Sequence, residues 1–193
     1  MSDKCLKIVL TGGPGGGKTT ALDLFQRELN DKLCVVPEAA SMLFSGGLPR
    51  SEDKNVIKCT QKTIYNLQCS LEQIQSHLHP DKILICDRGT VDGFAYWPGD
   101  EDFFESMETT IDKELARYDA VIFFETSAAN GTNMKSNNPV RTENQEQALE
   151  LDKKLHDIWS KHHNFNYVAS SESFVQKIMF GIMTIENVIK KHR

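Results

Sequence analysis

The sequence predicts one α/β domain, in which a five-stranded parallel sheet carries helices on both faces. Short apolar runs recur along the whole chain, and amphipathic helical patterns separate them. None of these runs alternates between apolar and polar residues, as a strand with one wet face would. Alternation of strands and helices favours parallel strands joined by crossover helices. With 193 residues and no internal repeat or linker, we expect a single domain over residues 1–193.

The predicted elements follow one another at regular intervals. The five strands are expected at Lys7–Thr11, Leu33–Val36, Lys82–Cys86, Ala120–Phe124 and Phe165–Ala169. A helix is predicted over residues 20–29, directly after the first strand. Two more helices are indicated by apolar residues at helical spacing. The first contains Ile64, Leu67, Leu71, Ile74 and Leu78, and the second contains Ala148, Leu151, Leu155, Ile158 and Trp159.

Composition narrows the class of protein. The net charge is −5, from 22 basic and 27 acidic residues, which argues against a general nucleic-acid binder. Five cysteines without a CxxC pair favour reduced thiols in a cytoplasmic protein. The N-terminus lacks the apolar stretch of a signal peptide. The apolar segment of residues 174–189 is too short and too polar for a transmembrane helix.

Residues 10–20 read LTGGPGGGKTT and place five of the twelve glycines within six residues. Such a run would weaken a strand or a helix, because glycine loses the most backbone entropy on ordering. Its spacing, GxxxxGK[ST] between a strand and a helix, matches the P-loop, whose backbone N–H groups and helix N-terminus bind phosphates. The predicted nucleotide-binding residues are Gly12, Gly13, Pro14, Gly15, Gly16, Gly17, Lys18, Thr19 and Thr20.

Mg²⁺ is expected beside the phosphates. In a P-loop, Lys18 would reach the β- and γ-phosphates, and the Thr19 hydroxyl would ligate the metal. A second ligand should close a neighbouring strand, where Asp87 follows an apolar run. The alternative is that Asp87 caps the next helix. Arg88 comes next, as is usual in nucleoside and nucleotide kinases, and would bind substrate or the transferred phosphate. Its alternative role is a structural ion pair.

Four motifs together resemble the AAA-type ATPase domain of the NadR and translocation-defect-protein group. They are GGPGGGKTT (12–20), VPEAAS (36–41), DRGTVDGFAY (87–96) and NPVRTENQEQALELDKKL (138–155). The resemblance covers essentially the whole chain, and the group is close to the nucleoside and nucleotide kinases. It implies a three-layer P-loop NTPase fold with strand order 2-3-1-4-5, Mg-nucleotide binding and a mobile lid.

The lid is expected at approximately residues 126–142. This segment contains no acidic residue, whereas Lys135 and Arg141 are cationic. Because a lid covers triphosphate charge during transfer, Arg141 is the expected phosphate contact. Alternatively, Arg141 pairs with a nearby carboxylate such as Glu143 or Glu146. Kinases of this type often carry two or more lid arginines, and this segment has one.

The acceptor side is expected around Glu38, which follows the second strand at the carboxyl edge of the sheet. Resemblance to nucleoside kinases, with Ala39 in place of the usual proline, makes Glu38 the expected catalytic base. The alternative is a helix cap. Gln61 and Gln68 would read a base edge or be solvated, and Asp92 would assist the metal or substrate or lie on a helix surface. The acidic residues between positions 100 and 114 are expected on a solvated helix face.

The predicted function is an Mg²⁺-dependent kinase for a small molecule of nucleoside or nucleotide type, such as ribosylnicotinamide. Its catalytic residues would be Lys18, Glu38, Asp87, Arg88 and Arg141. ATP is the default nucleotide because the NKxD element of GTPases is absent, with GTP as the alternative. The competing prediction is a nucleotide-binding switch, or a slow ATPase or GTPase, that acts on a protein or phospholipid partner.

Overall fold

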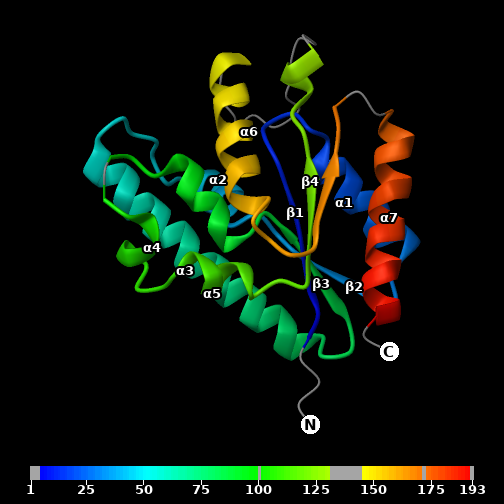
Figure 1. The fold of residues 1–193 in the computed structure, drawn as a ribbon. Helices are drawn as coiled ribbons and strands as arrows, with labels where there is room; N and C mark the ends of the chain where they lie inside the picture. Colours follow the sequence, from blue (N-terminus) through cyan, green and yellow to red (C-terminus); the bar gives the residue numbers. More distant parts are fainter. Residues whose placement is uncertain (1–4, 100, 131–144, 171–172, 192–193) are drawn as a thin grey trace.

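The structure, a computed structural model, describes residues 5–99, 101–130, 145–170 and 173–191. Its described part contains a five-stranded parallel sheet with the order β2-β3-β1-β4-β5 (Figure 1). The predicted α/β fold and strand order are therefore confirmed. The strands are β1 (Lys7–Thr11), β2 (Leu33–Val36), β3 (Ile83–Asp87), β4 (Ala120–Phe124) and β5 (Phe165–Val168).

Helices cover both faces of this sheet (Figure 1). The α-helices are α1 (Lys18–Glu28), α2 (Ala39–Ser45), α3 (Lys54–Leu78), α4 (Phe103–Ser106), α5 (Ile111–Leu115), α6 (Gln145–Trp159) and α7 (Phe174–Lys191). Two 3₁₀ segments, η1 (Thr90–Tyr96) and η2 (Ser127–Asn130), follow β3 and β4. Among the described residues, no helix is long and apolar enough to cross a membrane.

Two apolar cores lie on opposite faces of the sheet. Ile8 and Leu10 of β1 pack with α1 and α7 on one face, whereas Val9 packs with η1, α5 and α6 on the other. Every residue of β3 and β4 is buried, which explains why their sequences lack alternation. Burial of both faces thus accounts for the apolar runs that predict the strands.

The α3 helix departs from the sequence prediction. Two of the apolar residues expected to define its buried face, Ile74 and Leu78, are 51% and 64% exposed. Its buried side chains are instead polar, namely Gln61, Gln68 and Glu72. Apolar spacing places a helix correctly but cannot recognise a buried face whose polar groups are paired with distant residues.

The prediction of a solvated acidic face between positions 100 and 114 is wrong for Glu114, which is 3% exposed. Its carboxylate accepts hydrogen bonds from the hydroxyls of Tyr65 (2.8 Å), Thr90 (2.6 Å) and Thr109 (2.9 Å). Three donors from separate elements compensate the loss of hydration of this carboxylate.

Candidate active site

The glycine-rich loop joins β1 to α1 in a conformation that requires glycine. Gly12, Gly15 and Gly17 have φ angles of 128°, 77° and 85°, in the region that side chains disfavour. A Cβ on Gly12 would lie 1.9 Å from the carbonyl oxygen of Phe124. The loop therefore lies against the end of β4 with no space for a side chain.

Donors from Lys18 and from the β4–η2 junction hold the loop carbonyls. The Lys18 ammonium donates to the carbonyl oxygens of Gly12 (2.8 Å) and Gly13 (2.7 Å). The Thr126 hydroxyl donates to the Pro14 carbonyl, and the Ser127 hydroxyl to that of Gly15 (3.0 Å). These bonds fix the orientation of four consecutive peptide groups.

The N-terminus of α1 is suited to binding an anion. Its N-cap is Gly17, which has no side chain to cap the helix. The first N–H groups of a helix have no intrahelical acceptor, and the helix dipole adds positive charge there. Lys18 is 2% exposed, and its hydrogen bonds to the Gly12 and Gly13 carbonyls place its ammonium at the loop. The structure thus brings the predicted phosphate-binding residues together.

Thr19 and Asp87 supply oxygen atoms of the kind that Mg²⁺ prefers. Thr19 lies in the exposed first turn of α1, and Asp87 is the last residue of β3, paired in register with Leu10 of β1. Mg²⁺ commonly binds one or two protein oxygens together with water and substrate phosphates. A hydroxyl and a carboxylate next to a phosphate-binding loop fit that pattern, so these two residues would hold the ion.

Arg88 connects the loop to two carboxylates. Its backbone φ angle is 70°, which is unusual for a residue other than glycine. The guanidinium donates from Nε to Glu38 (2.7 Å) and from Nη1 to Asp92 (2.8 Å) and the Gly12 carbonyl (3.3 Å). Burial opposes the charge, but Tyr96 and the two carboxylates outweigh it and raise the pKa of Arg88. Arg88 is therefore a buried, permanently charged group.

The two carboxylates have further donors. Glu38 occupies the N-cap position of α2 but caps no backbone N–H, and instead accepts the Ser41 hydroxyl. Asp92 is buried rather than on a helix surface, and it accepts from Thr11 (2.9 Å) and from the indole N–H of Trp159 (2.8 Å). The alternative prediction, that Glu38 caps the helix through its side chain, is thus not supported by the geometry.

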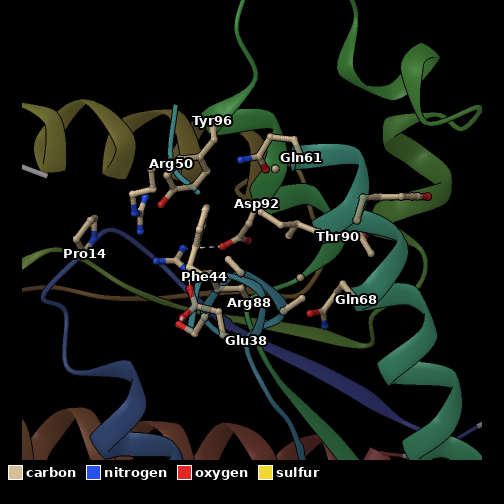
Figure 2. Close-up of a pocket in the computed structure, with 17 residues that line it drawn as sticks. Pro14, Glu38, Phe44, Arg50, Gln61, Gln68, Arg88, Thr90, Asp92 and Tyr96 are labelled. Atoms are coloured by element: carbon tan, nitrogen blue, oxygen red, sulfur yellow. Dashed lines mark hydrogen bonds and ion pairs between the residues drawn. The ribbon is translucent and has the colours of Figure 1, made fainter. Parts of the chain in front are cut away.

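A pocket of about 110 Å³ lies between this cluster and α3 (Figure 2). Pro14 of the phosphate-binding loop forms part of its wall, together with Glu38 and Arg88. The remaining lining residues include Gln61, Gln68, Phe44 and Tyr96. A cavity of about 200 Å³ adjoins it and shares Gln61, Phe44 and Tyr96 with it. Arg50 lines both spaces as well, so a cationic side chain lies at their junction.

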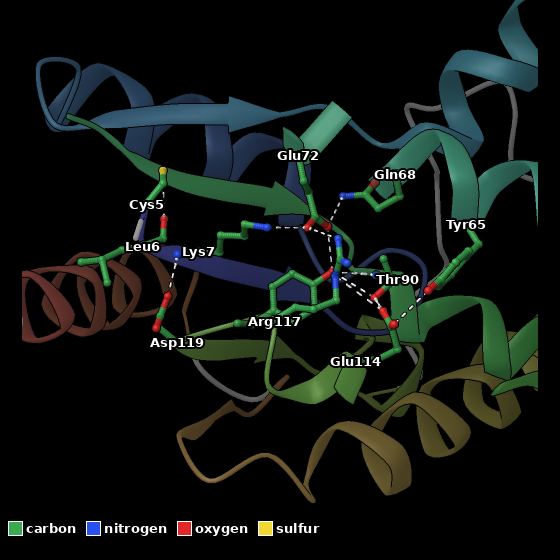
Figure 3. A network of polar contacts seen from close by, with 11 residues as sticks. Cys5, Leu6, Lys7, Tyr65, Gln68, Glu72, Thr90, Glu114, Arg117 and Asp119 are labelled. Atoms are coloured by element: carbon green, nitrogen blue, oxygen red, sulfur yellow. Dashed lines mark hydrogen bonds and ion pairs between the residues drawn. The ribbon is translucent and has the colours of Figure 1, made fainter. Parts of the chain in front are cut away.

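A buried polar network supports the pocket wall (Figure 3). Glu72 is fully buried and accepts from Gln68 (3.2 Å), Tyr118 (2.8 Å) and Arg117 (2.8 Å), and it pairs with Lys7 (3.2 Å). Because a carboxylate only accepts, the Gln68 amide nitrogen must face Glu72. The Gln68 carbonyl oxygen therefore points away from Glu72. Gln68 is also one of the residues that line the pocket.

Sequence reasoning missed Asp152 and Trp159 as contributors to the site, and it placed Thr126 and Ser127 in the predicted lid without expecting their hydrogen bonds to the loop. Asp152 could have been noticed, since a charged residue occupies the apolar stripe of α6 between Ala148 and Leu155. The other three carry no such signal. The predicted lid cations Lys135 and Arg141 lie outside the described residues.

The phosphate-binding loop joins β1 to α1 and lies next to β3, which ends in Asp87, in a sheet of order 2-3-1-4-5. These features together define a P-loop nucleotide-binding protein. A family model described as an AAA domain matches residues 7–177, so the chain belongs to the AAA domain family. Among curated proteins, none matches the sequence of this chain.

Proposed function

We propose that this protein is an Mg²⁺- and ATP-dependent kinase that phosphorylates a small hydroxyl-bearing acceptor of nucleoside or nucleotide type. The observation that carries the proposal is the pocket that Pro14, Glu38 and Arg88 line together. A transferase needs an acceptor space beside its phosphate-binding loop, whereas a switch needs only segments that respond to the γ-phosphate. The resemblance to NadR-type ribosylnicotinamide kinases supports the same proposal.

In this mechanism, the chain positions two substrates and stabilises charge. Lys18 and the N-terminus of α1 bind the phosphates, and Thr19 and Asp87 hold Mg²⁺. The metal, when bound, neutralises charge that develops on the β- and γ-phosphate oxygens. Arg141 would add a further cation from the predicted lid.

Glu38 is the proposed base. The acceptor oxygen forms a bond to the γ-phosphorus as the bond from that phosphorus to the ADP oxygen breaks, and the acceptor proton passes to Glu38. Arg88 holds one Glu38 oxygen at 2.7 Å and so fixes the direction of the carboxylate. Among the described residues, Nη2 of Arg88 makes no hydrogen bond, which leaves that group to contact the acceptor or the transferred phosphoryl group.

The far end of the pocket suits a planar group that can form hydrogen bonds. Gln68 offers a carbonyl oxygen whose direction is set by the hydrogen bond from its amide nitrogen to Glu72. Gln61 is also buried on α3, seven residues earlier and so near the same face of the helix. Tyr96 supplies aromatic surface on which a ring would stack, whereas the Arg50 guanidinium covers one face of Phe44, at 4.1 Å from its ring centroid. A nucleobase or a carboxamide-bearing ring has both properties.

The test is release of ADP from Mg-ATP in the presence of nucleosides, nucleotides and ribosylnicotinamide, with GTP as a second donor. We expect acceptor-dependent turnover for at least one compound. With that acceptor saturating, Glu38→Gln should lower turnover by about 10²–10⁴-fold while ATP affinity stays unchanged. A loss under about threefold would remove Glu38 as a base. Turnover that no acceptor stimulates would instead favour the switch.

A further inference from the structure

Asp152 is a buried carboxylate beside the phosphate-binding loop, and the proposed mechanism does not use it. It projects from α6, and a single oxygen, Oδ1, accepts the backbone N–H groups of both Gly13 (2.7 Å) and Thr126 (3.0 Å). A Cβ on Gly13 would lie 2.5 Å from that oxygen. The contact is thus built at close range by three segments that are distant in the sequence.

These two bonds hold both sides of the loop. Gly13 belongs to the loop itself, and Thr126 is the residue whose hydroxyl holds the Pro14 carbonyl. Asp152 therefore fixes the loop directly and fixes the neighbour that supports it. Gly13 and Thr126 are both fully or nearly fully buried, so no water would replace Asp152 without rearrangement.

The charge of Asp152 opposes what the loop does. An uncharged amide oxygen would accept the same two N–H groups, but a carboxylate adds a negative charge next to a site for phosphate anions. Burial raises the pKa of Asp152, although the N–H groups of Gly13 and Thr126 and the charge of Lys18 act in the other direction. Glu125, the residue directly after β4, adds a second negative charge near Asp152. Lys18 interacts electrostatically with Asp152 and would also interact with a bound phosphate, so the two anions compete for the same cation.

We propose that Asp152 is a positioning residue for the P-loop whose negative charge also weakens phosphate binding and so sets the nucleotide affinity. Its hydrogen bonds keep the loop in its binding conformation, and its charge limits how tightly the product nucleotide is held. This role concerns the phosphate side alone and does not depend on the identity of the acceptor.

Three variants separate the two effects. Asp152→Asn keeps an oxygen for Gly13 and Thr126 and removes the charge, whereas Asp152→Ala removes both. Asp157→Asn is the matched control, because it makes the same change of net charge at an exposed position of α6. The probe is N-methylanthraniloyl-ADP with excess Mg²⁺, titrated by fluorescence, and each variant is melted to compare stability.

We expect Asp152→Asn to bind the probe about three- to tenfold more tightly than the parent, with a similar melting temperature. Asp152→Ala should bind about tenfold more weakly, since two buried N–H groups lose their acceptor. Asp157→Asn should match the parent. Equal or weaker binding by Asp152→Asn, or an equal gain in Asp157→Asn, would overturn the role of the charge. Binding by Asp152→Ala as tight as by Asp152→Asn would overturn the positioning role.

A pH series distinguishes this role from a structural one and remains decisive if Asp152→Ala fails to fold. The ratio of the dissociation constants of the parent and Asp152→Asn cancels the titration of the probe's own phosphates. Because the pKa of Asp152 is raised, the carboxylate becomes neutral as the pH falls through that value. The ratio should therefore be largest at neutral and higher pH and approach one in acid. A ratio independent of pH would contradict the proposal.

Discussion

Replacement of Arg88 by methionine tests whether the carboxylates around the loop depend on one buried cation. Methionine has similar length and no charge, so the change removes the ion pairs to Glu38 and Asp92 with little loss of volume. Removing one partner of a buried ion pair costs about 3–5 kcal/mol, because the other charge stays buried and unpaired.

The expected loss lies near the lower end of that range. Asp92 keeps the hydrogen bonds from Thr11 and Trp159, and Glu38, whose side chain is 14% exposed, keeps the one from Ser41. We therefore expect the free energy of unfolding to fall by about 3 kcal/mol. For a domain of this size, that corresponds to a melting temperature lower by roughly 6–12 °C.

The assay is urea and thermal unfolding of Arg88→Met, Glu38→Gln and the double variant. If Arg88 and Glu38 interact as the geometry indicates, the double variant should lose less than the sum of the single changes, by about 1–3 kcal/mol. A loss below about 1 kcal/mol for Arg88→Met, or additivity within about 0.5 kcal/mol, would refute the reasoning.

Three other changes have defined outcomes. Lys18→Ala should abolish measurable Mg-ATP binding by calorimetry while the protein stays folded by circular dichroism; parental affinity would contradict the role of the P-loop lysine. Gly181→Ala should destabilise the protein by about 1–3 kcal/mol, because the new Cβ would lie 2.2 Å from Phe25 Cζ; an unchanged melting curve would contradict tight packing of α7 against Phe25. Burial raises the pKa of the Cys86 thiol, so iodoacetamide should modify exposed Cys59 in the native protein and reach Cys86 only after denaturation, as mass spectrometry of the labelled peptides would show.

The strands and the phosphate-binding loop could be predicted from the sequence because their signals are local. Four predicted strand starts agree with the structure, and β3 begins one residue later than predicted and includes Asp87. Burial on both faces produces continuous apolar runs. Gly12, Gly17 and Lys18 lie within one short segment, so their spacing can be recognised from the sequence alone. Such patterns predict the conformation of their own segment and do not depend on residues that are distant in the sequence.

The contacts that shape the site could not be predicted in this way. Arg88 and Glu38 are 50 residues apart, and Gly13 and Asp152 are 139 apart. Apolar periodicity treats a charge within a helix stripe as an interruption, although at Asp152 and Glu72 the charge is buried with its donors in place. Only the tertiary structure decides which charges are paired, because the free energy of burying a charged group depends on partners that the fold brings together.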